Sequence, residues 1–88
     1  MEYNELTEKL KGEIISYCNL VGVEPSSIKN DTPLFGDGLA LDSIDSIELV
    51  VLIEREYGIK INSATDGRKI LVDVDHMARF IIDHKANA

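Results

Sequence analysis

The sequence predicts an all-α fold, a small bundle of three main helices plus one short helix, with a long loop between the first two main helices. Three segments of the chain carry apolar residues at the three- and four-residue spacing of amphipathic helices. Both prolines and three of the six glycines fall in one stretch, residues 22–42, which interrupts this pattern. Residues 59–61 are too few and too isolated to be expected as a strand. With 88 residues, the chain is expected to form a single domain over residues 1–88.

The first main helix is expected over residues 4–21. Its apolar side is formed by Tyr3, Leu6, Leu10, Ile14, Tyr17, Cys18 and Val21. Gly22 is well placed to end it. Cys18 continues the apolar side, so we expect it to be a small core residue. As the only cysteine it excludes an internal disulfide framework, and it fits a reducing cytoplasm.

The connection over residues 22–42 is long for a compact domain, so it must be functional or held down by its own side chains. Six apolar residues could attach it to the core: Val23, Ile28, Leu34, Phe35, Leu39 and Leu41. Gly36, Asp37 and Gly38 are typical of a turn.

The remaining helices follow in order. The second main helix is expected over residues 43–57, closed by Gly58. A short helical stretch over residues 63–71 is interrupted by Gly67. The last helix is expected over residues 74–85, with Asp73 as N-cap and Asp75 in its first turn. Its apolar face consists of Val74, Met77, Ala78, Ile81 and Ile82, with Phe80 at one edge.

Charge and hydropathy exclude several classes of protein. The formal charge is −7, whereas nucleic-acid binding needs a basic surface. No stretch approaches the roughly 20 apolar residues of a membrane span. The first residues are charged, so they are not expected to form a signal peptide. The acidity favours steering toward basic partners, or it serves solubility alone.

The second helix carries two apolar faces. At about 100° per residue, one arc contains Leu49, Val50, Ile53 and Tyr57. A second arc, centred about 150° away, contains Ile44, Ile47 and Val51, flanked by Glu48, Glu54 and Arg55. A small bundle cannot easily bury both arcs. We therefore expect the first arc to face the core and the second to be a docking surface, unless the long loop covers it.

The start of this helix combines capping residues with two serines. Asp42 is a good N-cap, and Asp45 stands three residues on, as in a capping box. Ser43 then becomes the first helical residue and points outward. An anion attached there would lie beside free backbone N–H groups at the positive end of the helix. The adjacent carboxylates oppose that attraction, so they either serve capping alone or bind a metal that accompanies phosphate transfer.

The stretch "LALDSIDSIELVVLIEREYGIKI", residues 39–61, resembles the carrier-site region of acyl carrier proteins. The family pattern is Asp-Ser-Leu, then Asp, then an apolar-Glu-Leu-Val run, ending in Glu-x-x-aromatic-Gly. The matching residues here are Asp42-Ser43-Ile44, Asp45, Ile47-Glu48-Leu49-Val50 and Glu54-Arg55-Glu56-Tyr57-Gly58. The likeness extends along the chain, through "GVEPSSI" after the first helix and "LVDVDHMARFI" at the last.

The resemblance implies a non-catalytic carrier domain with a 4′-phosphopantetheine arm on Ser43 and a motif residue, Asp42, before it. A phosphopantetheinyl transferase installs the arm from coenzyme A, and acyl groups ride on its thiol as thioesters. Ser46 falls where the family often has threonine and is expected to stay unmodified. The implied partners are the transferase, an acyl-loading ligase or transferase, and ketosynthase-type enzymes. They would dock on Ile44, Ile47, Glu48, Val51, Glu54 and Arg55 of a cytoplasmic monomer.

Among carriers of fatty acid, polyketide or related specialised biosynthesis, three departures from the family pattern favour a dedicated carrier for a specialised acyl, polyketide or aminoacyl pathway over the housekeeping carrier of fatty acid synthesis. Ala40-Leu41 stands where the family often has Gly-Ala. The residues 36–38 add one position to the long loop, and Arg55 stands where acidic residues are common.

Other functions remain open on the sequence. The chain could carry aminoacyl or peptidyl groups, or it could be a helical adaptor that docks through the same apolar arc without any prosthetic group. An enzyme is disfavoured because Ser43 has no histidine near it in sequence, and His76 and His84 read as solvated helix residues. A calcium loop is disfavoured because Leu39 and Leu41 occupy positions that need oxygen ligands.

Overall fold

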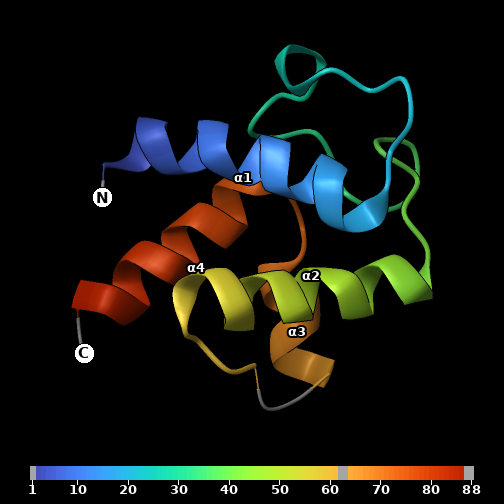
Figure 1. The fold of residues 1–88 in the computed structure, drawn as a ribbon. Coiled ribbons are helices and arrows are strands. Elements are labelled where there is room, and N and C mark those ends of the chain that lie inside the picture. The colour runs from blue at the N-terminus through green and yellow to red at the C-terminus, as the bar shows by residue number, and fades with distance from the viewer. Residues whose placement is uncertain (1, 62–63, 87–88) are drawn as a thin grey trace.

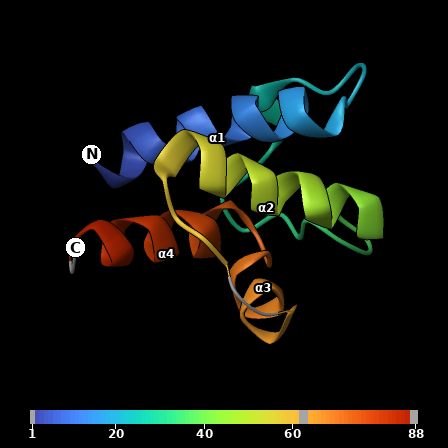
Figure 2. The ribbon, with the colours of Figure 1, turned by 60° about the horizontal axis from the view of Figure 1, so that its bottom comes forward.

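The computed structural model, which describes residues 2–61 and 64–86, is an all-α bundle. Its elements are α1 (Tyr3–Cys18), the 3₁₀ turn η1 (Pro25–Ser27), α2 (Ser43–Tyr57), α3 (Ala64–Ile70) and α4 (Val74–Ala86). Helices α1 and α2 lie side by side and run in opposite directions, and α4 packs against α1 (Figures 1 and 2). The described residues form no strand, only an isolated bridge between Phe35 and Leu41. The predicted fold class, with its long loop between α1 and α2, is confirmed.

The core lies where the three main helices meet. It is built from Leu6, Leu10 and Ile14 of α1, Leu49, Leu52, Ile53 and Tyr57 of α2, and Val74, Met77, Ala78 and Ile81 of α4. The short helix α3 and the turn after it add Ile70 and Leu71. The phenol of Tyr17 donates to Glu56 at 2.8 Å, and that of Tyr57 donates to Glu13. These pairs join α1 to α2 across the outer edge of the core. No helix in the described ranges has the length and apolarity needed to cross a membrane.

Helix α1 ends three residues earlier than its apolar pattern predicts. Asn19 takes the left-handed backbone (φ 54°), and the N–H groups of Asn19 and Leu20 bond back to the carbonyls of Ser16 and Ile15. Asparagine tolerates this conformation, so the helix closes in a Schellman motif before Gly22 is reached. The expectation that Val21 belongs to the apolar side is wrong, because Val21 is 89% exposed.

The long loop is held to the core as expected. Ile28, Leu34 and Leu41 are buried, and Val23, Phe35 and Leu39 pack against the core with part of their surface exposed. The turn at residues 36–38 lets the Leu39 N–H bond to the Pro33 carbonyl at 2.9 Å. Gly38 is required there, because a Cβ atom would lie 1.9 Å from the same carbonyl oxygen.

The loop also bonds to the C-terminal part of the chain. The Leu34 N–H bonds to the Val72 carbonyl, and the Asp75 N–H bonds to the Asn30 carbonyl, each at 2.9 Å. The short turn η1 within this loop was not predicted. Proline at its first position fixes a suitable φ but gives no periodic signal.

The other helices match their expected positions closely. Helix α2 spans the predicted residues and ends at Gly58 in the left-handed conformation (φ 70°). The short helix α3 runs through Gly67, so the predicted interruption there is wrong; residue 63, where the helix was expected to begin, lies outside the described residues. Helix α4 extends one residue beyond its predicted end.

Candidate attachment site and docking surface

The start of α2 is a complete capping box. One oxygen of Asp42, Oδ1, accepts from the N–H groups of Ile44 and Asp45, each at 3.0 Å. In return, Asp45 Oδ2 accepts from the Asp42 N–H at 3.0 Å. Capping therefore accounts for both carboxylates without the metal that the sequence left open. It also corrects one expectation: while Asp42 caps the helix, the N–H groups of Ile44 and Asp45 are not free for an attached anion.

The two serines of the motif have different surroundings. The Ser46 hydroxyl donates to the Ser43 carbonyl at 2.7 Å, and this residue is half-buried. Ser43 is exposed, and its hydroxyl has no hydrogen-bond partner among the described residues. It lies at the first position of the helix, in a backbone fixed by the capping box. Ser43 therefore offers an accessible, unbonded hydroxyl on a fixed backbone, and Ser46 does not.

The second apolar arc of α2 is open to solvent. Ile44 is 67% exposed and Ile47 is 61% exposed, while Val51 is half-buried. The long loop does not cover them. Glu48 is half-buried beside them, and Glu54 and Arg55 are exposed. The helix brings these six residues onto one face, as their spacing predicts. We call the face formed by Ile44, Ile47 and Val51 the apolar stripe.

The buried side of α2 is wider than the predicted arc. Leu49, Ile53 and Tyr57 are buried as expected, and Leu52 is also fully buried. Leu52 lies about 60° around the helix from Leu49. It is buried there because α1 covers that side as well. The sequence carried this signal, since Leu52 adjoins the core arc and leucine is among the residue types most often fully buried.

The surroundings of Cys18, the last residue of α1, show which side of α2 faces α1. Its side chain is half-buried and packs against the core, which partly meets the expectation of a core residue. Burial raises the pKa of the Cys18 thiol to about 11, and the carboxylates of Asp45, Glu48 and Asp42 add to the shift. The acidic residues at the start of α2 thus lie close to the end of α1.

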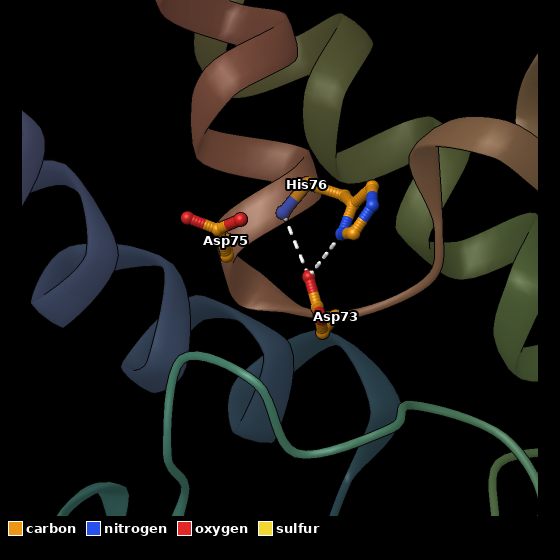
Figure 3. A group of neighbouring side chains, drawn as sticks. All are labelled: Asp73, Asp75 and His76. Atoms are coloured by element: carbon orange, nitrogen blue, oxygen red, sulfur yellow. Dashed lines mark hydrogen bonds and ion pairs between the residues drawn. The ribbon is translucent and has the colours of Figure 1, made fainter.

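A second cluster of side chains, of types that can bind a metal ion, lies at the start of α4. Asp73, Asp75 and His76 place ligand atoms within 4.8 Å of one another (Figure 3). Asp73 is the predicted N-cap, and its Oδ1 accepts from the His76 N–H at 2.7 Å. The same oxygen lies 2.6 Å from His76 Nδ1. His76 is exposed, as expected of a solvated helix residue, and its ring is also paired with Asp73 within the cap.

The Asp75 carboxylate is held by other partners, on the opposite side of the helix start from His76 (Figure 3). It accepts from the Tyr3 hydroxyl of α1 and from Arg79 Nε at 2.9 Å. These bonds, first from Tyr3 and then from Arg79, hold the pKa of Asp75 below its usual range. The cluster thus caps α4 and ties it to α1, and its two carboxylates are already engaged with protein groups.

Comparisons with known proteins agree with the geometry at α2. Residues 13–65 match the family described as "Phosphopantetheine attachment site". The chain is 31% identical over 78 residues to an acyl carrier protein of Rhodopseudomonas palustris (strain TIE-1), covering 89% of this chain and 91% of that protein. It is also 31% identical over 83 residues to an acyl carrier protein of Zymomonas mobilis, covering 94% of this chain and 99% of that protein.

Proposed function

The chain belongs to the acyl carrier protein family, and from that premise we propose that Ser43 is the residue to which its 4′-phosphopantetheine arm is attached. The function is that of an acyl carrier, and the prosthetic group is held covalently. One observation carries the assignment of the residue. Of the two motif serines, Ser43 has the exposed and unbonded hydroxyl, whereas Ser46 is bonded to the backbone.

The surroundings of Ser43 suit an attached arm. The capping box fixes the backbone on both sides of Ser43, so the side chain projects from a fixed place at the start of the helix. The apolar stripe begins at the next residue, Ile44. The arm supplies a thiol that forms thioesters with acyl groups, and the chain itself positions and presents it. The family consists of carriers rather than catalysts.

We further propose that the chain is a substrate of a phosphopantetheinyl transferase. The transfer forms a phosphodiester between Ser43 Oγ and the pantetheine phosphate of coenzyme A. It breaks the pyrophosphate bond and releases 3′,5′-adenosine diphosphate and the serine proton. The Asp42 carboxylate already accepts two N–H groups, so its role in this proposal is to hold the helix start that presents Ser43.

Partner enzymes are proposed to dock on the apolar stripe. Besides the transferase, they include an acyl-loading ligase or transferase and ketosynthase-type enzymes. The exposure of Ile44 and Ile47 supports this, together with the acidic residues beside them and the chain's charge of −7. Residues 1–88 act here as one carrier domain, a cytoplasmic monomer that meets each enzyme in turn.

The cargo is proposed to be a specialised acyl group. The family's usual glycine before the motif is replaced by Ala40, which nevertheless keeps the left-handed backbone (φ 56°). Leu41, in place of the usual alanine, is buried in the core. These changes alter the loop that leads into Ser43, and Arg55 reduces the acidity of the partner-facing helix. An aminoacyl or peptidyl cargo is the nearest alternative.

Intact-mass spectrometry tests the attachment directly. The wild-type protein, Ser43→Ala and Ser46→Ala are each incubated with coenzyme A and a purified phosphopantetheinyl transferase. Wild type and Ser46→Ala should each gain the mass of one phosphopantetheine, and Ser43→Ala should gain none. Loading of Ser43→Ala would contradict the assignment. No loading of the folded wild type would favour an adaptor that docks without a prosthetic group.

A further inference from the structure

Val21 is the most exposed large apolar residue in the described part of the chain, at 89%. It lies in a turn between two residues of left-handed backbone, Asn19 (φ 54°) and Gly22 (φ 81°). The residue before it, Leu20, points inward and packs against the core. Isolated exposed apolar residues are ordinary on protein surfaces. Val21 therefore matters only if its place on the molecule gives it a partner.

That place is the end of the bundle where α2 begins. In both ribbon views the end of α1 and the start of α2 lie at the same end of the molecule (Figures 1 and 2). The electrostatic effect of Asp45 and Glu48 on the Cys18 thiol agrees with this, because Cys18 is three residues before Val21. The two most exposed apolar segments, the turn after α1 and the stripe on α2, are thus neighbours.

The order of side chains around α2 puts Ile44 between α1 and Ser43. Starting from Ile44, Glu48 lies about 40° and Asp45 about 100° toward the side that faces α1. Ser43 lies about 100° in the other direction. A surface centred on Ile44 therefore extends to Ser43 on one side and, across the acidic residues, to the end of α1 on the other.

We propose that Val21 is a second apolar contact for the phosphopantetheinyl transferase, on the far side of Ile44 from Ser43. The proposal rests on the function proposed above, because it takes Ser43 as the residue that the transferase must reach. A protein–protein interface of ordinary size buries about 800 Å² on each partner, a patch about 28 Å across. The molecule measures 36 × 27 × 20 Å, so a footprint of that size is comparable with its width, and the turn after α1 lies at the same end of the molecule as the start of α2.

Charge complementarity is the reason for choosing this partner. Coenzyme A carries several phosphates, so the site that binds it must be cationic. The surface between Val21 and Ser43 carries the carboxylates of Asp42, Asp45 and Glu48, and the whole chain has a charge of −7. A transferase with a cationic rim around its coenzyme A site, and with apolar side chains that contact Ile44 and Val21, matches this arrangement of charge and exposed apolar surface.

The experiment compares Val21→Ser with a matched control, Val72→Ser. Val72 is an exposed valine (40%) in the turn between α3 and α4, and in sequence it is distant from both α1 and the first turn of α2. For Val21→Ser, the transferase's KM for the carrier should rise about 3- to 10-fold with kcat unchanged, because the contact is made equally before and during the reaction. Val72→Ser should be loaded with wild-type constants. Val21→Lys should raise KM further at low salt, since it adds a positive charge opposite a cationic rim.

A binding measurement separates the contact from an effect on folding. The ¹⁵N-labelled Ser43→Ala protein, which cannot be loaded, is titrated with the transferase in the presence of coenzyme A. The amide signals of Val21 and Gly22 should shift together with that of Ile44, and the melting temperature of Val21→Ser should equal that of wild type, because Val21 is 89% exposed.

The outcomes distinguish this inference from the function on which it rests. If Val21→Ser keeps the wild-type KM while Ile44→Ser raises it, Val21 lies outside the interface and the inference is overturned. Unshifted Val21 and Gly22 amides beside a shifted Ile44 amide would overturn it in the same way. In both cases the attachment to Ser43 would stand. Loading of Ser43→Ala would instead remove the proposed function itself.

Discussion

Helix α2 offers a sharp test because it places a core residue and a docking residue only two positions apart. Leu49 is fully buried, and Ile47 is 61% exposed. Leu49→Ala should lower the free energy of unfolding by about 2–5 kcal/mol, the usual range for a leucine truncated in a packed core. Leu49 also lies near the middle of α2, where the surrounding helices leave it little room to collapse.

The matching change at Ile47 should cost much less. Burying a whole isoleucine side chain contributes about 1.5–3 kcal/mol, and only about two-fifths of Ile47 is buried. The loss is therefore about 0.6–1.2 kcal/mol. Alanine is a better helix former than isoleucine, and this offsets the loss in the free energy of unfolding by about 0.4 kcal/mol. The net change expected for Ile47→Ala is less than about 1 kcal/mol.

Two measurements on each variant check this reasoning. Urea unfolding followed by circular dichroism gives the free energy of unfolding, and the initial rate of phosphopantetheine loading gives the docking effect. Ile47→Ala should be nearly as stable as wild type but loaded more slowly at low carrier concentration. The account is refuted if Ile47→Ala is destabilised as severely as Leu49→Ala, because the stripe would then belong to the core.

Three further predictions follow from individual residues. Glu48→Lys should slow loading at low salt, and the difference from wild type should shrink as salt screens it; equal rates at low salt would mean that the carboxylate does not steer this partner. Ala40→Gly should raise the free energy of unfolding by up to about 1 kcal/mol, because it removes the side chain from a left-handed backbone; a loss of stability in urea unfolding would contradict this. The rate at which iodoacetamide alkylates the Cys18 thiol should reach half of its maximum near pH 9 in the unfolded protein and only at about pH 11 in the native protein, and coincident profiles would refute the effect of burial. The same raised pKa gives stability that is present below pH 9 and lost as the pH rises toward 11.

The boundaries of α2 were predictable because local signals and the hydrophobic pattern agree there. Asp42 and Asp45 start the helix and Gly58 ends it, and the observed contacts are those the residue types imply. The division between buried and exposed faces was predictable for the same reason. The position of Ser43 as the first residue of the helix follows from the cap alone.

The end of α1 was not predictable from periodicity. The apolar spacing continues to Val21, but the chain leaves the helix at Asn19, whose left-handed backbone satisfies two carbonyls. Gly22 offered a competing stop signal three residues later. With the helix ended at Asn19, Leu20 packs against the core, and the apolar spacing of the helix does not signal this contact.

Contacts between elements that are distant in sequence could not be predicted from the hydrophobic spacing either. The width of the buried side of α2, including Leu52, depends on how α1 crosses it. The pairing of Asp75 with Tyr3 joins the first and last helices, and nothing in the local sequence of either one signals it. The Asp73 carboxylate pairs with both the backbone N–H and the ring of His76. The pairing with the ring depends on the side-chain rotamer of His76, which capping rules do not fix.

The measurement that tests the central claim most directly is the location of the added mass in the loaded wild-type protein. Trypsin releases residues 30–55 as one peptide that contains both Ser43 and Ser46. Fragmentation between the two serines, at Ile44 or Asp45, assigns the phosphopantetheine to one of them. The account predicts that all of the added mass lies on Ser43. Added mass on Ser46, or on any residue outside this peptide, would contradict it.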